Sequence, residues 1–237
     1  GTHFITLNNC KQDGSYIRQP LGYFLFNQAG LPHSRSNFAE VYVNDKKIGV
    51  YLNIEPVKDL HIQNNFGGND KGNLYELAMP GHLTDDFHPR MTDLISFEGF
   101  TTYSDKSDLK LATQEISTNG LSGMAKVIDV EEFLKIFGME TLLKHWDGYT
   151  ANLNNTLIYN DVTAVATPTL DNVKLKFIPW GIDQILQERP IQFGNGSFLG
   201  NLILNDANSL ARLKAVIRNY IHTIFDQANY ASVLSPY

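Results

Sequence analysis

The polar stretch from His145 to Asn155 carries side chains suited to metal binding and proton transfer. It reads His-Trp-Asp-Gly-Tyr-Thr-Ala-Asn-Leu-Asn-Asn, so Asp147 and Asn152 lie five positions apart. A carboxylate can accept a proton from a hydroxyl group, and an amide oxygen is a hard, neutral ligand for a divalent metal ion. The same stretch is also compatible with an asparagine-rich turn in which the side chains bond to the loop backbone.

A second stretch adds a carboxylate at the end of a predicted strand. The strand at 173–178 ends at Pro179, and Asp183 follows just past its end. An Asp, an Asn five positions later, a pair of strands and then another Asp is the order of the phosphoryl-transfer centre in protein kinases. The alternative is structural: Asp183 caps the turn after Pro179, while Trp180 and Ile182 belong to the core.

Rigid elements are predicted on both sides of the first stretch. Asp129 and Glu132 form a capping-box-like pair, and a buried apolar stripe continues to about Trp146, which predicts a helix over this range. A strand is predicted at 156–159. The loop between them, at 148–155, is therefore held at both ends, as a catalytic loop requires.

The remaining elements come from hydrophobic periodicity and from turn residues. A helix near Pro20 is expected to end at Gly30, and a β-hairpin is expected at 38–54. Further predictions are a strand at 3–7, a short helix at 57–63, a strand at 73–77 and a final helix at 209–228. This order indicates an α+β fold with a small mixed lobe at 1–55 and a larger, mainly helical lobe at 56–237.

Composition excludes several classes of protein. The chain has 237 residues, 43% of them hydrophobic and 19% charged, which is ordinary for a folded protein with one large domain or two lobes. A net charge of −6 argues against general binding to nucleic acid or to membrane surfaces. No apolar run approaches the ~20 residues of a membrane span. Cys10 is the only cysteine, so neither an internal disulfide nor a cysteine-based zinc site is expected.

Along most of its length the chain resembles the CotH kinase family, the atypical protein kinases similar to spore coat protein H. Each matching segment is weak alone, but their order and spacing together are fairly specific. The segments are 7–9, 13–18, 29–32, 42–44, 48–55, 72–76, 145–149 with 152–155, and 177–184. The resemblance implies a two-lobed kinase-like fold that uses ATP with Mg²⁺ or Mn²⁺. It also implies phosphorylation of Ser on a coat or secreted protein, and a location in the spore coat, the cell envelope or outside the cell.

The resemblance also implies roles for individual residues. It makes Asp147 the catalytic base, Asn152 a metal ligand and Asp183 the principal metal ligand. Glu55 falls where the lobes would hinge against the nucleotide base. The expected set of site residues is completed by Trp180 at the cofactor and by His145, Asn155 and Gln184 in supporting positions. For His145 two interpretations stand: it orients Asp147, or it ends a helix favourably as a cation.

The chain departs from the family pattern at two places. Many members carry Trp-Asp-x-Asp where this chain has Trp180-Gly-Ile-Asp183, and a subset with Trp-Gly-x-Asp-Gln favours Asp183 as the working ligand. The lysine that holds the nucleotide phosphates is expected on a strand upstream of residues 3–7. The sequence therefore indicates an N-terminally truncated small lobe and weak nucleotide binding by these 237 residues.

Three functions remain candidates. The first is ATP- and metal-dependent phosphoryl transfer to Ser or Thr of a coat or secreted protein. The second is a catalytically weak, kinase-like scaffold or binding module in coat or envelope assembly. The third is transfer of a nucleotidyl group through the same metal site.

Overall fold

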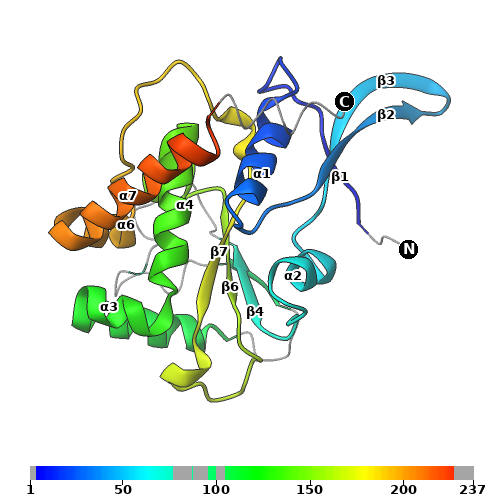
Figure 1. The fold of residues 1–237 in the computed structure, drawn as a ribbon. Helices are drawn as coiled ribbons and strands as arrows, with labels where there is room; N and C mark the ends of the chain where they lie inside the picture. The colour runs from blue at the N-terminus through cyan, green and yellow to red at the C-terminus, as the bar shows by residue number, and fades with distance from the viewer. Residues whose placement is uncertain (1–3, 77–86, 88–95, 100–104, 227–237) are drawn as a thin grey trace.

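The computed structural model of the protein describes residues 4–76, 87, 96–99 and 105–226, which form a mixed α+β fold (Figure 1). One antiparallel sheet has the order β1-β3-β2 and the other has the order β5-β4-β6-β7. The strands are β1 Thr6–Asn8, β2 Ser36–Val43, β3 Lys46–Ile54, β4 Asn73–Glu76, β5 Ser96–Gly99, β6 Thr156–Asn160 and β7 Leu175–Pro179. The α-helices are α1 Arg18–Gln28, α2 Asp59–Asn65, α3 Ser107–Val127, α4 Val130–Leu143, α5 Tyr149–Asn152, α6 Phe198–Asn205 and α7 Ala207–Thr223. Two 3₁₀ turns, η1 Leu170–Asn172 and η2 Ile182–Gln184, complete the described elements.

The four-stranded sheet is covered on both faces, so every residue of β6 and β7 is buried. Ile62 of α2 and Phe66, the residue that follows this helix, pack against Tyr159 and Ile178 on one face. On the other face, the ring of Phe133 in α4 meets that of Phe177 in β7 with centroids 5.2 Å apart. Helices α3, α4, α6 and α7 gather on this second side (Figure 1). Because β6 and β7 are buried on both faces, they hold the loop before β6 and the turn after β7 in fixed positions.

Helix α1 links the N-terminal part of the chain to the rest of the core. It packs against α4 and η2. A Cβ atom at Gly22 would lie 2.5 Å from Cδ1 of Ile182 and 2.8 Å from Cδ1 of Ile185, so only glycine permits this close approach. The contact fixes η2, the turn that carries Asp183.

The β2–β3 hairpin extends away from the body of the molecule (Figure 1). Asn44 and Asp45 at its turn have φ values of 49° and 62°, the left-handed pair that a two-residue hairpin turn requires. Only the base of β3 pairs with a third strand, because β1 lies opposite residues 52–54. Leu52 and Ile54 are accordingly buried, whereas Tyr42, Val43 and Ile48 are about half exposed.

The structure confirms the elements that have strong local signals and revises others. The hairpin is present, α1 begins at Arg18 with Pro20 in its first turn, and the Asp129 side chain caps α4 by accepting a bond from the Glu132 amide. The predicted end of α4 at Trp146 is wrong. Lys144 takes a left-handed conformation with φ 54°, and the amides of residues 144 and 145 bond back to carbonyls of the last turn, which ends the helix at Leu143.

Three helices were not expected, and two predicted ends shift. Helices α3 and α6 had no sequence prediction, and α5 lies inside the expected loop at 148–155. The first strand begins at Thr6 rather than at residue 3, which is outside the described residues. The last helix ends at Thr223, while residues 227 and 228 of its predicted range are not among those described. Within the described part of the chain, no helix is long and apolar enough to cross a membrane.

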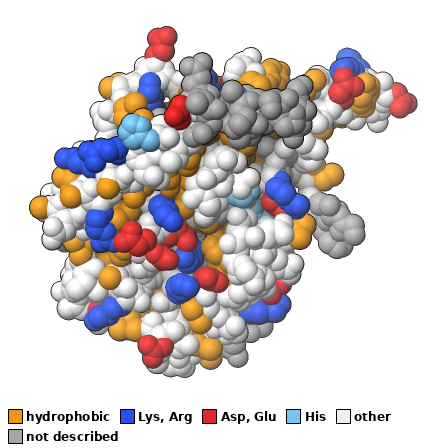
Figure 2. Space-filling model, in the orientation of Figure 1, with side chains coloured by type: hydrophobic (Ala, Val, Ile, Leu, Met, Phe, Trp, Pro, Cys, Tyr) orange, Lys and Arg blue, Asp and Glu red, His pale blue; other side chains and the backbone are white. Residues whose placement is uncertain are grey.

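Charged side chains of both signs are interspersed on the face shown in Figure 2. Among the described residues on that face, no extended basic patch is visible.

Candidate active site

The register of β6 against β7 brings the two chemistry-bearing stretches together. Thr156, the first residue of β6, pairs with Pro179, the last residue of β7. The ladder continues one step further, where the Trp180 amide donates to the Asn155 carbonyl at 2.9 Å. Because the strands are antiparallel, the loop that precedes β6 and the turn that follows β7 must lie at the same end of the sheet.

Asp147 is held by amide side chains from its own loop. Its Oδ1 accepts from Nδ2 of Asn152 at 2.6 Å, and its Oδ2 accepts from Nδ2 of Asn154 at 3.1 Å and of Asn155 at 2.9 Å. A carboxylate has about four acceptor positions, so roughly one remains on Oδ1 for a further donor such as a hydroxyl group. The loop is thus an asparagine-rich turn whose amides bond to Asp147, and the same bonds orient that carboxylate.

The bonds to Asp147 also orient the amide oxygens. Because Asn155 donates to Asp147 through Nδ2, its Oδ1 faces the other way, toward Gly181. A Cβ atom at Gly181 would lie 2.1 Å from that oxygen, and Gly181 has a left-handed φ of 54°. No side chain fits at this position unless Asn155 moves, which gives a physical reason for glycine here.

Asp183 lies in η2 and is tied to the first strand of the molecule. Its Oδ2 accepts from Nδ2 of Asn8 at 3.2 Å, and the same amide donates to Oε1 of Gln19 at 2.9 Å. Burial raises the pKa of Asp183; the Asn8 bond opposes the rise, while the negative charges of Asp13 and Asp147 add to it. A positive ion placed beside Asp183 would relieve both the burial penalty and this repulsion.

An open pocket of about 490 Å³ adjoins Asp183. It lies between the three-stranded sheet and the turn after β7. Its lining includes Asn8, Gln19, Tyr51, Ile54, Trp180 and Asp183. None of the described residues that line it is Lys or Arg, so its polar contacts come from amides, hydroxyl groups and one carboxylate.

His145 and Glu140 lie buried beneath the loop that carries Asp147. Glu140 accepts from the Tyr149 and Thr150 amides and, at 2.6 Å, from the Thr150 hydroxyl group. Burial raises the pKa of Glu140 to about 6, although the bonds from Thr150 and Tyr149 oppose the rise. Burial lowers the pKa of His145 to about 4, despite the nearby charge of Asp147. His145 is therefore a neutral, buried ring near neutral pH, which disfavours the interpretation in which it ends the helix as a cation.

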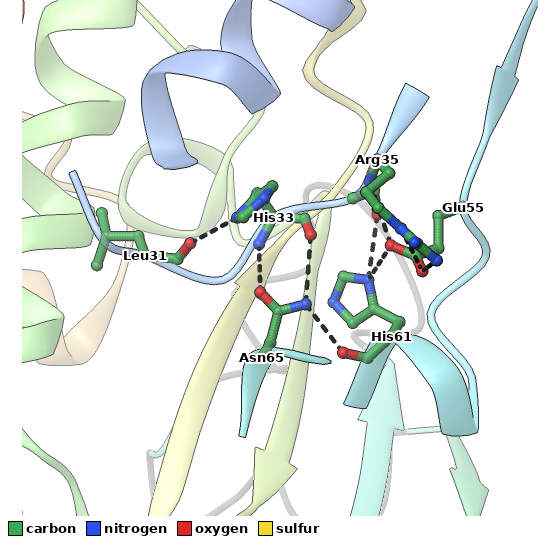
Figure 3. A network of polar contacts seen from close by, with 7 residues as sticks. Leu31, His33, Arg35, Glu55, His61 and Asn65 are labelled. Atoms are coloured by element: carbon green, nitrogen blue, oxygen red, sulfur yellow. Dashed lines mark hydrogen bonds and ion pairs between the residues drawn. The ribbon is translucent and has the colours of Figure 1, made fainter. Parts of the chain in front are cut away.

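Glu55 does not line the pocket through its carboxylate. The carboxylate accepts from Nε and Nη2 of Arg35 at 3.0 and 2.5 Å and lies 3.7 Å from Nδ1 of the buried His61 (Figure 3). Burial would raise the pKa of Glu55, but His61 and Arg35 outweigh it and lower the pKa to about 2. The neighbouring Ile54 lines the pocket instead. Contact between Glu55 and a nucleotide base therefore stays a prediction.

Ser34 also touches this network, yet the arrangement is not a hydrolase triad. The Ser34 hydroxyl lies 3.5 Å from Nδ1 of His61, the same ring nitrogen that faces Glu55. A triad needs the acid and the nucleophile on opposite ring nitrogens. Ser34 and His61 are both buried, so the three side chains connect the base of the hairpin to α2.

The residues at the sheet end are suited to a hard divalent cation whose coordination shell is completed by oxygens of the substrate. Among the described residues there is no group of three or more His, Cys, Asp and Glu side chains that could hold a metal alone. Asp183, with amide oxygens of Asn152 and Asn155, would supply only part of a coordination shell. Mg²⁺ is commonly bound in this way, by one or two carboxylates together with nucleotide phosphates and water.

Sequence reasoning missed the side chains that come from distant parts of the chain. Asn8 of β1 bonds to Asp183 and also to Gln19 of α1, and Asn154 and Glu140 support the loop. The segment 7–9 belonged to the family pattern, and this was the one available signal for Asn8. Of the remaining predicted residues, Trp180 lines the pocket, while Gln184 is half-buried beside Asp183.

Comparison with known proteins identifies the class. The family model described as CotH kinase protein matches residues 1–227, and the chain belongs to this family. Two fungal proteins of Rhizopus delemar are similar to it. "Invasin CotH2" is 24% identical over 195 residues, which cover 76% of this chain and 31% of that protein. "Spore coat protein homolog 1" is 22% identical over 259 aligned positions, which cover 99% of this chain and 40% of that protein. The chain thus spans less than half the length of these curated relatives.

Proposed function

We propose that this chain carries out ATP- and divalent-metal-dependent phosphoryl transfer to Ser or Thr of a coat or secreted protein. The observation that carries the proposal is the meeting of Asp147, its three amide partners and Asp183 at one end of the β6–β7 pair. Membership of the CotH kinase protein family supports it. The names of the two relatives favour a coat or cell-surface setting.

In the proposed reaction Asp147 positions the acceptor and takes its proton. The hydroxyl oxygen forms a bond to the γ-phosphorus, the bond between that phosphorus and the β–γ bridging oxygen breaks, and ADP leaves. The hydroxyl proton passes to the open acceptor position on Oδ1 of Asp147. A bound Mg²⁺ or Mn²⁺ supplies charge neutralisation for the phosphate oxygens. Asp183, Asn152 and Asn155 would hold that ion, so the contribution of the protein is mainly positioning and electrostatics.

The pocket beside Asp183 is the proposed nucleotide site. Its walls come from β1, α1 and β3 on one side and from the Trp180–Asp183 turn on the other. A nucleotide there would lie between a small lobe at 1–55 and a large lobe at 56–237, as in a two-lobed kinase. Trp180 and the neighbourhood of Glu55 are the proposed contacts for the base.

The second candidate is a kinase-like scaffold with little turnover. The observation that favours it is that none of the described residues lining the pocket is Lys or Arg. Nucleoside triphosphates carry several negative charges, and kinase sites ordinarily add a strand-borne lysine to the metal. A binding module needs no such cation.

Transfer of label from ATP separates the candidates. The chain is incubated with Mg²⁺ or Mn²⁺ and with ATP labelled at either the γ- or the α-phosphorus, together with a serine-rich acceptor peptide. We expect protein-bound or peptide-bound label from γ-labelled ATP only, and none from the Asp183→Asn chain. Label from α-labelled ATP would instead identify nucleotidyl transfer. No label from either, together with no thermal stabilisation by ATP and metal, would overturn the proposal in favour of the scaffold.

A further inference from the structure

A second cavity, of about 230 Å³, lies behind the loop that carries Asp147. Its walls are the end of α4, the start of α5 and the segment at 189–195 that leads toward α6. His145, Trp146 and Thr150 form part of its lining, so it touches the residues on either side of Asp147 but does not include that carboxylate. It is separate from the pocket beside Asp183, and the two share no lining residue.

Buried polar atoms in this cavity lack partners. His145 is 3% exposed; its ring lies near the Trp180 backbone, which opposes the lowering of its pKa by burial, but neither ring nitrogen makes a hydrogen bond of ordinary geometry within the described part of the chain. The indole Nε1 of Trp146 is likewise buried and unpaired there. A buried polar group without a partner costs free energy, and most such groups in native proteins are satisfied by protein, water or a ligand. The unpaired indole donor, beside the buried His145 ring, therefore points to an acceptor-rich ligand.

The charge around the cavity is positive. Arg189 lies over the Trp146 ring, 4.7 Å from its centroid, and Lys144 also lines the wall. The described contacts of these two cations are weak: Nε of Arg189 reaches Oε1 of Gln187 at 3.4 Å, and Nζ of Lys144 reaches the carbonyl of Gln187 at 3.5 Å. Both therefore keep donors for a ligand.

One acid, Glu140, lines the same cavity, but it is engaged elsewhere. Its Oε1 accepts from the Tyr149 amide and its Oε2 accepts from the amide and the hydroxyl group of Thr150. The carboxylate is thus directed toward the start of α5. The groups of this cavity that are available to a ligand are therefore two cations and a free donor, although the net charge of the chain is −6.

We propose that this cavity binds a phosphoryl group, held by Arg189 and Lys144 and by the unpaired indole donor of Trp146. A phosphoryl group offers three strong acceptor oxygens, and its planar O–P–O edges match the guanidinium fork of arginine. The group is either inorganic phosphate or a phosphorylated side chain. Because the cavity contacts residues on both sides of Asp147, its occupant orders that loop from behind.

Calorimetric titration with inorganic phosphate, without nucleotide or metal, tests the proposal independently of phosphoryl transfer. We expect saturable binding with a Kd of about 1 mM or tighter. Arg189→Gln should weaken it at least ~10-fold, since a charge-assisted bidentate pair is lost. Arg218→Gln removes the same charge from an exposed position on α7 and should leave the Kd unchanged. Circular dichroism checks that both variants remain folded.

Tryptophan fluorescence locates the ligand. Phosphate should change the emission of the wild-type chain, and the response should disappear in Trp146→Phe but persist in Trp180→Phe. A peptide bearing phosphoserine that binds at least ~10-fold more tightly than phosphate would identify a phosphorylated side chain as the occupant; equal or weaker binding would identify the free anion. Absence of saturable binding, or equal weakening by Arg189→Gln and Arg218→Gln, would overturn the proposal.

Discussion

The carboxylate of Asp183 lies in surroundings that disfavour its negative charge and raise its pKa. It is partly buried, and two further carboxylates, Asp13 and Asp147, repel it. A single amide, from Asn8, bonds to Oδ2 at 3.2 Å. Groups whose surroundings disfavour their charged form gather at functional sites, because a ligand supplies the missing compensation.

Asp183→Asn should therefore separate binding from stability. We expect the variant to lose Mg-dependent ATP binding, because the principal anionic oxygen is gone. Its apo form should be as stable as the wild type or more stable, because the unfavourable charge is removed and an amide oxygen can still accept from Asn8. Calorimetric titration with Mg-ATP and urea unfolding measure the two effects. Unchanged Mg-ATP affinity would remove Asp183 from the site.

Asp147→Asn should act on the chemical step. The variant is expected to bind nucleotide and to transfer the phosphoryl group at least ~10² times more slowly, because the proton acceptor is lost. Asn at this position must also face three amide donors with one oxygen, so the loop will be less well ordered. The rate of phosphoryl transfer and the affinity for nucleotide are both measured for the variant and for the wild type. An equal loss of both would assign Asp147 a structural or metal-binding role.

Sequence spacing indicated Asp147, Asn152 and Asp183 as candidates, and the pairing of β6 with β7 brings their two segments to one end of the sheet, while their roles stay predictions. Spacing was not sufficient to indicate Asn8 or Gln19. Their positions depend on the pairing of β1 with β3 and on the packing of α1 against η2, which are contacts between distant parts of the chain. The role of Glu140 could not be predicted for a similar reason, because an acid at its position in the sequence is expected to be exposed.

Among the elements, α3 depends most on a single residue. Gly120 lies inside it with φ 57° and ψ −131°, a conformation that is outside the helical region and essentially restricted to glycine. The element is thus two helical segments joined at a kink, and Nζ of Lys126 bonds to Oε1 of Glu115 across it at 2.6 Å. The interruption, together with the many Ser, Thr and Asn residues, explains why no continuous helical pattern predicted α3.

Gly120→Ala is expected to destabilise the fold by about 1–3 kcal/mol, the cost of a strained backbone conformation. No neighbouring atom lies within 4 Å of the added Cβ, so the effect comes from the backbone alone. Gly14→Ala is a matched control, because Gly14 has equally open surroundings and no left-handed φ. Urea unfolding of the two variants provides the comparison. Equal stability in both would mean that the kink relaxes without cost.

Elements with strong local signals could be predicted, and elements that depend on tertiary contacts could not. The hairpin at 36–54 could be predicted from its turn residues, and the start of α4 from the Asp129 cap. The end of α4 could not be predicted, because a left-handed lysine is an unusual helix terminator. That conformation at Lys144 turns His145 away from the helix and beneath the Asp147 loop.

At the scale of the whole molecule, two buried groups give opposite dependences of stability on pH. The pKa of Glu140 rises from 4.5 to about 6, so the folded state holds more protons and stability falls as pH rises through this range. The pKa of His145 falls from 6.5 to about 4, so the unfolded state holds more protons and stability rises with pH through this range. In the wild type the two contributions largely offset each other.

Single variants should expose each contribution. Glu140→Gln leaves the His145 contribution, so the free energy of unfolding should rise between pH 4 and 6.5, by an amount on the order of 3 kcal/mol. His145→Gln leaves the Glu140 contribution, so the free energy of unfolding should fall between pH 4.5 and 6, by an amount on the order of 2 kcal/mol. Urea unfolding across this range gives the slopes. Identical slopes in both variants and the wild type would contradict the assignment.

The β2–β3 hairpin has a consequence for the hydrogen exchange of its amides. Beyond residue 52 toward the turn, β3 has no third strand beside it within the described part of the chain, and the exposed Lys47–Glu40 ion pair there contributes little. The tip should therefore open and close locally without unfolding of the core. In deuterated water, amides at 41–48 should exchange quickly and with little dependence on denaturant, whereas those of Leu52 and Ile54 should exchange only through global unfolding. Uniform protection along both strands would show that another surface stabilises the tip.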